Sequence, residues 1–305
     1  MLMTIKKLWA KITAKVLNSE NSKNRTTNNS SGVNSNDMRA KGDIVINNGG
    51  MVLYSIEEVA KQLVNSVFGE LSQETKALIA INQQSYFQIL REEIVGIKKQ
   101  GDELKKTVDS PDFQYISKQA AISASRSSSA ELHKNLASLL IHRINHDQED
   151  LKKIMYDEAI TVTPKITLDQ LKIATLCFVI KHTKKNGITT PALFHQFLIN
   201  AIKPLVDFKN TNIQFAHLVY TGCVTLTVSH HNLVDIFKRH YGNIFKDDES
   251  LKTLLLNDET AIKLLSVWQE TPIKRMELTS IGIAIASSYL EQITKDKIDI
   301  DCLIN

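Results

Sequence analysis

The sequence contains little glycine and proline, with 11 and 5 of these residues in a chain of 305. Because β-sandwiches and barrels need many tight turns, this scarcity argues against them and favours long helices. No run approaches 18 consecutive apolar residues, so we expect no transmembrane helix. The N-terminus also lacks a continuous apolar segment followed by a small-residue cleavage site, so we expect no secretory signal.

Cysteine is also scarce, and the three residues Cys177, Cys223 and Cys302 lie far apart. This spacing excludes a CxxC metal finger and is typical of unpaired thiols in a reducing cytoplasm. The sequence carries no GxxxxGK[ST] or GxGxxG phosphate loop and no GxSxG nucleophile motif. We therefore expect no cofactor and a function that is not enzymatic.

The net charge of +4 is distributed unevenly along the chain. Residues 1–41 hold eight Lys or Arg against two Asp or Glu, so the rest of the chain is slightly acidic. A near-neutral body gives no electrostatic reason to expect nucleic-acid binding. A basic terminal segment is instead suited to an anionic surface.

Residues 1–17 have the pattern of a basic amphipathic helix. Its lysines recur every four residues, and its apolar residues lie on the opposite face: the candidate contact residues are Lys7, Lys11, Lys15, Leu8, Trp9 and Ile12. Such a helix is suited to an anionic membrane surface or to a protein partner. Docking on its own domain or a neighbouring subunit, and plain disorder, are the alternatives.

Residues 18–41 are rich in Asn, Ser and Thr and are interpreted as a disordered linker. Residues 42–54 follow as a predicted β-hairpin, with Asn-Asn-Gly-Gly at the turn. Because an isolated two-stranded hairpin is marginally stable in water, we expect it to pack on helices or to add to strands of other subunits, and Ile44 and Ile46 are candidates for self-association.

Residues 55–109 are predicted to be a long helical region. Apolar residues at alternating steps of three and four include Phe87, Leu90, Ile94 and Ile97, and this spacing favours a coiled-coil stalk that mediates self-association. A long helical hairpin inside the domain is the alternative. Gly96 and Gly101 weaken a continuous helix here.

Residues 110–305 are predicted to form the main α-helical domain. Periodicity and capping residues indicate helices over 111–126, 130–146, 148–161, 167–180, 190–207, 211–222, 231–241, 250–269 and 278–294, with a short strand at 224–228. The predicted fold class is therefore all-α, mainly a helical bundle, with a minor N-terminal β-hairpin.

One cluster of residues has metal-ligand spacing. His142 and His146 are one helical turn apart, and Asp150 follows. The glutamate of an HExxH metalloprotease is missing, and both histidines lie at a polar helix end, where the helix dipole favours them. We therefore treat them as weak metal candidates, with a structural role as the preferred interpretation.

Three blocks of sequence together carry a resemblance to a known family. They are NLASLL at 135–140, LDQLKIATL at 168–176 and LTSIG at 278–282. They resemble the Abi-alpha family of bacterial abortive-infection proteins. The whole chain, from GDIVINNG through PDFQY to ELTSIGIAI, is similar to an uncharacterised bacterial family known only by locus tags.

The resemblance implies a bacterial phage-defence protein. The predicted hairpin and stalk add self-association, and the basic helix adds action at a membrane surface or on a phage or host protein. The unpaired thiols predict a cytoplasmic location, and the basic helix adds the inner-membrane surface as a second site of action. A cytoplasmic adaptor or sensor with no membrane role is one alternative. A metal-dependent enzyme that uses His142, His146 and Asp150 is another.

Overall fold

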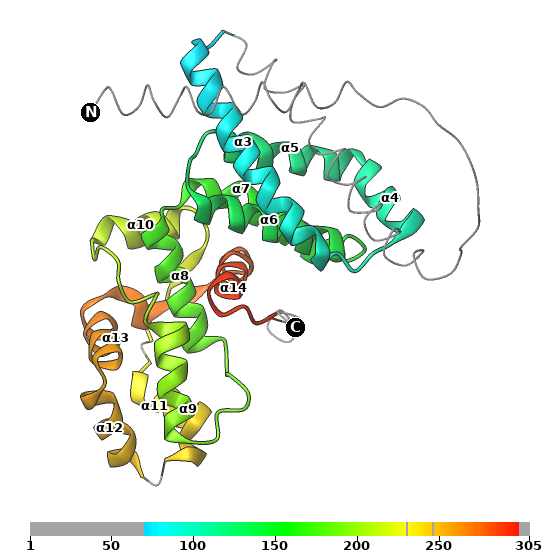
Figure 1. The fold of residues 1–305 in the computed structure, drawn as a ribbon. Coiled ribbons are helices and arrows are strands. Elements are labelled where there is room, and N and C mark those ends of the chain that lie inside the picture. Colours follow the sequence, from blue (N-terminus) through cyan, green and yellow to red (C-terminus); the bar gives the residue numbers. More distant parts are fainter. Residues whose placement is uncertain (1–69, 230, 246, 299–305) are drawn as a thin grey trace, which may run out of the picture. The chain divides into compact units, whose positions relative to one another are not determined.

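The computed structural model describes residues 70–229, 231–245 and 247–298. In these ranges the chain forms twelve α-helices and one small antiparallel sheet (Figure 1). The predicted all-α class is therefore confirmed for the described residues. The basic helix, the linker and the β-hairpin predicted over residues 1–54 lie outside them.

The first five described helices pack on one another. They are α3 (Gln73–Glu93), α4 (Gly101–Asp109), α5 (Pro111–Ser125), α6 (Ala130–Asn145) and α7 (Asp150–Val162). Helix α3 lies across α5 and α6, and α7 contacts both α5 and α6 (Figure 1). Three of these, α5, α6 and α7, begin and end within two residues of their predicted bounds.

The remaining helices are assembled around α8 and α14. They are α8 (Leu168–Lys181), α9 (Pro191–Phe197), α10 (Asn212–Tyr220), α11 (Leu233–Tyr241), α12 (Asp248–Asn257), α13 (Glu259–Glu270) and α14 (Ser280–Thr294). Helix α14 contacts α8 on one side and α6 and α7 on the other, so it joins the two groups (Figure 1). None of the helices in the described part is long and apolar enough to cross a membrane.

Side-chain caps define where many of these helices begin. The cap oxygen accepts a hydrogen bond from a backbone N–H in the first turn, which would otherwise be unsatisfied. Thr167 and Gln170 form a reciprocal capping box at the start of α8, as predicted. The other caps of α-helices are Ser72, Ser110, Ser129, Thr190, Asn232, Asp247, Asp258 and Thr279.

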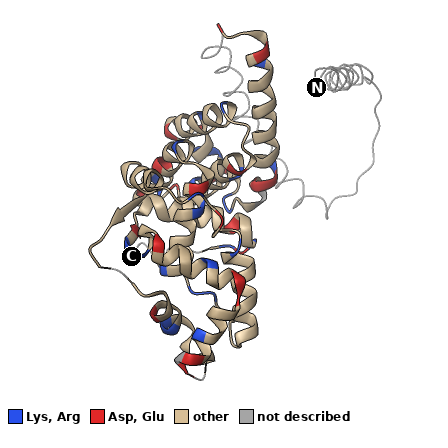
Figure 2. Ribbon diagram, turned by 90° about the vertical axis from the view of Figure 1, so that its left-hand side faces the viewer, with Lys and Arg blue, Asp and Glu red and all other residues tan. Residues whose placement is uncertain are grey.

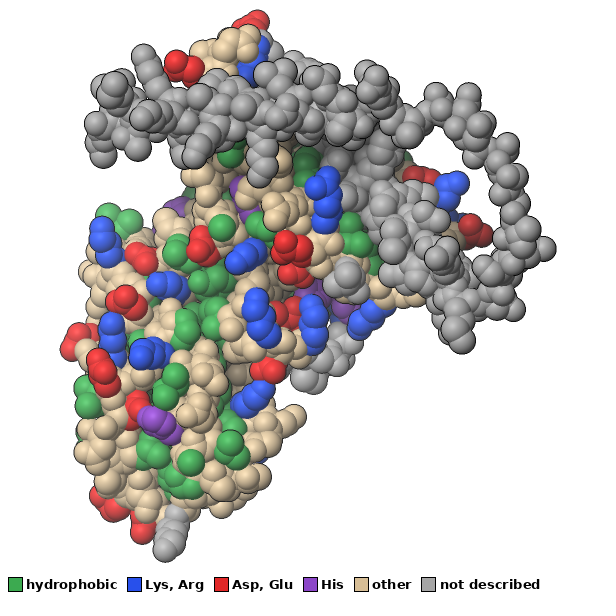
Figure 3. Space-filling model, in the orientation of Figure 1, with side chains coloured by type: hydrophobic (Ala, Val, Ile, Leu, Met, Phe, Trp, Pro, Cys, Tyr) green, Lys and Arg blue, Asp and Glu red, His purple; other side chains and the backbone are tan. Residues whose placement is uncertain are grey.

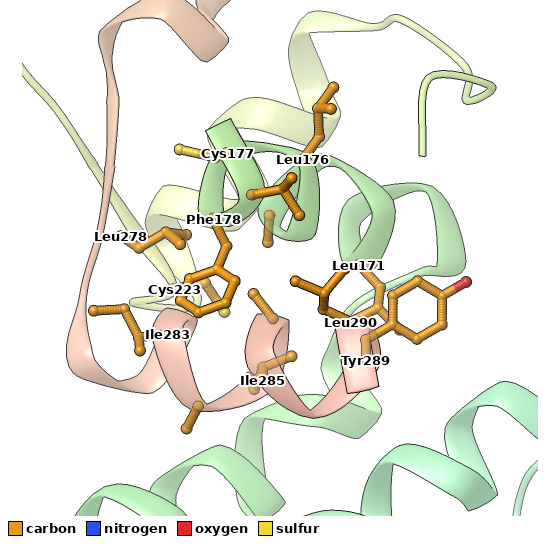
Figure 4. Close-up of a cluster of buried hydrophobic side chains, with 14 of the residues drawn as sticks. Leu171, Leu176, Cys177, Phe178, Cys223, Leu278, Ile283, Ile285, Tyr289 and Leu290 are labelled. Atoms are coloured by element: carbon orange, nitrogen blue, oxygen red, sulfur yellow. The ribbon is translucent and has the colours of Figure 1, made fainter. Parts of the chain in front are cut away.

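The centre of the fold is the contact between α8 and α14. Nearly every residue of α8 from 170 to 180 is buried, as its apolar sequence predicts. Figure 4 shows Phe178 of α8 pointing toward Ile283 and Ile285 of α14, with Leu278 and Cys223 beside them. This contact brings together two of the three blocks that carry the family resemblance, and α6, which contains the third, packs on α14.

The sheet consists of β1 (Val224–Leu226) and β2 (Met276–Leu278), paired antiparallel with Val224 opposite Leu278. The sequence predicts the first strand and places it correctly. The second strand, however, is only three residues long between α13 and α14, and it is paired by tertiary contact rather than by a hairpin turn.

The predicted coiled-coil stalk is replaced by two separate helices. Helix α3 ends at Glu93, a 3₁₀ turn follows over Ile94–Gly96, and α4 begins at Gly101, where φ is +58°. The Asn145 side chain of α6 holds this break, because it donates to the Gly96 carbonyl and accepts from the backbone N–H of Lys98. The heptad-like spacing thus spans a bend in the chain.

Two other predicted helices are also divided. The segment predicted as one helix over 190–207 is α9 followed by a π-helical turn at Leu198–Ile202. The segment predicted over 250–269 contains two helices, because the Asp258 carboxylate accepts from the Ala261 N–H at 2.8 Å and starts α13. A capping side chain inside an apolar pattern was the available signal for this second break.

Candidate functional site

The two histidines singled out by spacing lie where α6, α7 and α14 meet. His142 and His146 project from the last turn of α6, and the Tyr156 ring of α7 stacks against both imidazoles. The ring centroids are 5.6 Å apart in each pair, with interplanar angles of 8° and 23°. The tyrosine is 2% exposed, so α7 fixes the position of both imidazoles.

Each histidine has its own carboxylate partner. His142 Nε2 lies 3.1 Å from Glu291 Oε2 of α14, and His146 Nδ1 lies 2.7 Å from Glu149 Oε1. Asp150 begins α7 and is exposed. Within the described residues, no three His, Cys, Asp or Glu side chains come together as a metal site. The structure therefore does not bring His142, His146 and Asp150 together.

Glu291 is the residue of this cluster that the sequence does not reveal. It lies 149 positions after His142 and is 7% exposed on α14. Its Oε1 accepts the Ile298 N–H at 2.7 Å, because Lys295 adopts a left-handed conformation (φ 62°) and turns the chain back. One buried carboxylate thereby joins α6, α14 and the segment after it.

The electrostatics of Glu291 follow from these contacts. Burial alone would raise the pKa of this carboxyl group, but the hydrogen bond and charge of His142 oppose this effect. The Ile298 N–H and the ammonium group of Lys297 act in the same direction, so the pKa lies below its ordinary value. The carboxylate is thus held in its ionised form.

A cavity of about 280 Å³ opens beside this pair, and Ser138 lies on its wall, one turn before His142. A histidine supported by a carboxylate can act as a general base. Ser138, however, makes no hydrogen bond to His142 in the described part of the chain. The observed geometry fits a buried link between helices better than a nucleophile with its base.

Glu291 also makes stability depend on pH. Its folded-state pKa is depressed, so its contribution is present above the unfolded pKa and is lost as pH falls through the folded value. We expect Glu291→Gln to lower the free energy of unfolding by about 1–3 kcal/mol near neutral pH, and by progressively less in acid. Urea unfolding at a series of pH values measures this difference.

Glu158→Gln is the matched control, because Glu158 is exposed on α7. We expect this control to follow the wild-type pH profile. A Glu291→Gln deficit that stays constant down to about pH 3, below the ordinary pKa of glutamate, would contradict the assigned role.

Next to the histidines, α6 carries a fully buried arginine. The Arg143 guanidinium binds three carboxylates: Nε to Asp157 at 2.7 Å, Nη1 to Asp147 at 2.6 Å and Nη2 to Asp112 at 2.8 Å. The arginine side chain is 0% exposed, while its partners come from α5, α7 and the turn after α6. The planar fork of arginine is suited to this three-way contact.

The three aspartates differ in their ionisation. Lys153 and Arg143 hold the pKa of Asp112 below its ordinary value, against the opposing effect of burial. Burial opposes the shift at Asp147, but hydrogen bonds from Arg143 and Thr107 still lower its pKa. Burial raises the pKa of Asp157, and the neighbouring Asp112 adds to this. Asp157 is therefore the carboxylate that depends most on the arginine.

The candidate residues for self-association and for membrane or partner binding lie in other parts of the chain, some of them outside the described residues. Phe87 and Leu90 are buried in the protein's own core, and Ile94 and Ile97 are partly buried against it. These side chains therefore pack on the protein's own core. The self-association candidates Ile44 and Ile46, and the membrane or partner candidates Lys7, Lys11, Lys15, Leu8, Trp9 and Ile12, lie outside the described residues.

Comparison with known proteins gives one match. The model of an uncharacterised protein family matches residues 50–254 and 243–304, which is more than half of the chain. No curated protein and no solved structure matches the chain. The family match includes α6, α8 and α14, which form the packing centre described above.

Proposed function

The chain belongs to an uncharacterised protein family, and we propose that it is a non-enzymatic phage-defence protein that self-associates and acts through a protein surface. Two lines of support carry this proposal. One is the resemblance of three sequence blocks to abortive-infection proteins. The other is an exposed apolar helix face that has no charged side chain.

The resemblance is supported by where its blocks lie. Residues 135–140 are in α6, 168–176 in α8 and 278–282 at the start of α14. Helix α14 packs directly on the other two helices. Blocks separated by more than a hundred positions thus belong to one core, which is what a shared fold requires. The blocks supply packing and caps, so the site of action is sought on the surface.

The surface that carries the proposal is the outer face of α10. Ile213 is 80% exposed and Tyr220 is 85% exposed, and Ala216 lies between them on the same face. The helix contains no Asp, Glu, Lys or Arg. By contrast, charges of both signs are interspersed over other parts of the protein (Figures 2 and 3). Exposed aromatic and aliphatic side chains without charge are typical of protein interfaces.

A second copy of the chain is the partner that this face fits best. In a twofold-symmetric dimer the same patch lies on both sides of the interface. Because α10 bears no charged side chain, two copies would bring no like charges together on this helix. Hydrophobic burial of Ile213 and Tyr220 would then not be opposed by desolvation of an ion.

We expect Ile213→Gln/Tyr220→Gln to weaken self-association of the full chain by at least about tenfold, equivalent to about 1.4 kcal/mol. Sedimentation equilibrium over a range of concentrations measures this. Ile154→Gln is the matched control, because this isoleucine is 58% exposed on α7. We expect the control to associate as the wild type does.

A second experiment measures the plating efficiency of phage on bacteria that express the wild type, the α10 double variant or Ile154→Gln. We expect the wild type and Ile154→Gln to reduce plating, and the α10 variant to lose this effect. A monomeric wild type, or an α10 variant that associates normally, would overturn the assigned surface. Unchanged plating with the wild type would overturn the defence role.

A further inference from the structure

A second feature, independent of the proposed function, is a basic pocket of about 520 Å³. It lies between the loop after α8, the last turn of α11 and the start of α12. Its basic lining residues are Lys184, Lys238, Arg239 and His240, and the carboxylate on its wall is Asp247. The volume is within the range of small-molecule sites.

The sequence of α11 explains why its basic residues face this pocket. Leu233, Ile236, Phe237 and Tyr241 are buried on one side of the helix. Lys238 and Arg239 therefore fall on the opposite, exposed side near the helix C-terminus, while His240 is only partly exposed at the edge of the buried side. The Tyr241 hydroxyl accepts the Lys185 N–H at 2.9 Å and so holds the loop that carries Lys184 against α11.

The positive charge of this pocket is incompletely neutralised. Among the described residues, neither Lys184 nor Arg239 makes an ion pair or a side-chain hydrogen bond. Asp247 is occupied as the cap of α12, since its Oδ1 accepts from both the N–H and the hydroxyl of Ser250 at 2.7 Å. Burial lowers the pKa of His240, and the positive charges of Arg239 and Lys184, which line the same pocket, lower it further.

The geometry of the arginine and lysine side chains also suits a phosphate group. An arginine fork matches two oxygens of a phosphate, and a lysine adds a point charge. The ten-residue helix α12 begins at the pocket, but the Asp247 carboxylate already caps its N-terminus, so the attraction for an anion comes from the basic side chains. We propose that this pocket binds a small ligand bearing a phosphate group, with Arg239 and Lys184 as the principal contacts.

Isothermal titration calorimetry of the full chain with inorganic pyrophosphate tests the proposal. We expect saturable one-site binding, and we expect Lys184→Gln/Arg239→Gln to weaken it by at least about tenfold. Lys105→Gln/Lys106→Gln is the control. It removes the same charge from exposed positions on α4 that make no ion pair within the described chain. We expect the control to change affinity by less than about twofold.

Two further measurements keep the test decisive. Thermal unfolding confirms that the pocket variant is folded, and Arg239→Lys, which keeps the charge and loses the fork, should bind with intermediate affinity. The proposal is overturned if the wild type does not bind pyrophosphate, or if the pocket variant and the control weaken binding equally. Equal weakening would show a response to net charge alone.

Discussion

Replacing Arg143 with methionine is expected to lower the free energy of unfolding by about 3–5 kcal/mol, the typical cost of removing one partner of a buried ion pair. The variant leaves the carboxylates of Asp112, Asp147 and Asp157 without their common cation. We expect the ionised form of Asp157 to be destabilised most, because burial already raises the pKa of this carboxyl group while Arg143 is present. Urea unfolding monitored by circular dichroism measures the loss.

The pH dependence of the loss identifies its cause. Protonation neutralises the stranded carboxylates in the folded variant, so we expect the deficit to shrink as pH falls from about 7 to about 4. A deficit that came only from lost packing would not change with pH.

Two variants serve as controls. Arg126→Met removes an exposed arginine at the end of α5 and should alter stability by less than about 0.5 kcal/mol. Arg143→Lys retains the charge but not the three-way fork, so it should lie between wild type and Arg143→Met. If Arg143→Met and Arg126→Met were equally stable, the cluster would have no structural importance.

Gly282→Ala is expected to cost about 3 kcal/mol or more, at the upper end of overpacking effects. A Cβ atom at this position would lie 2.0 Å from the Cys223 carbonyl oxygen and 3.2 Å from Leu278 Cδ2. The backbone cannot move easily, because Thr279 donates from its N–H to the Cys223 carbonyl at 3.1 Å and from its hydroxyl to the Gly222 carbonyl at 2.6 Å. Thermal and urea unfolding measure the effect.

Gly242→Ala is the matched control for this substitution. A Cβ atom there would meet only Lys238 Cγ, at 3.5 Å, and the backbone is helical. We expect a change within about 0.5 kcal/mol. If both alanine variants were equally stable, the close approach of α14 to Cys223 would not restrict residue 282.

Gly282 also gives a physical reason for the last block of the family resemblance. In LTSIG, Thr279 caps α14 and Leu278 is the last residue of β2. Because Gly282 has no side chain, the first turn of α14 can lie directly against the backbone of Cys223, just before β1. Leu278, Thr279 and Gly282 of the motif therefore have packing or capping roles. The motif reports how the chain folds, and its presence does not by itself indicate an activity.

The sequence alone determined most helices in the described part of this protein. Caps such as Thr167 and Ser129, the 3.6-residue periodicity and the buried character of α8 depend on neighbouring residues, so they can be read locally. The same local rules overestimated the length of α3, because the spacing through Ile94 and Ile97 continued the pattern of a helix. The break was instead settled by Asn145, which is distant in sequence.

Only the tertiary structure decided which side chains meet. His142 and His146 were found from spacing, but their partners Glu291 and Tyr156 were not, since periodicity along one helix carries no information about another. The three carboxylates of Arg143, the pairing of β1 with β2 and the contact of Gly282 with Cys223 arise in the same way. Sequence patterns show which face of a helix is buried; the packing of α14 between α8 and α6 decides what that face touches.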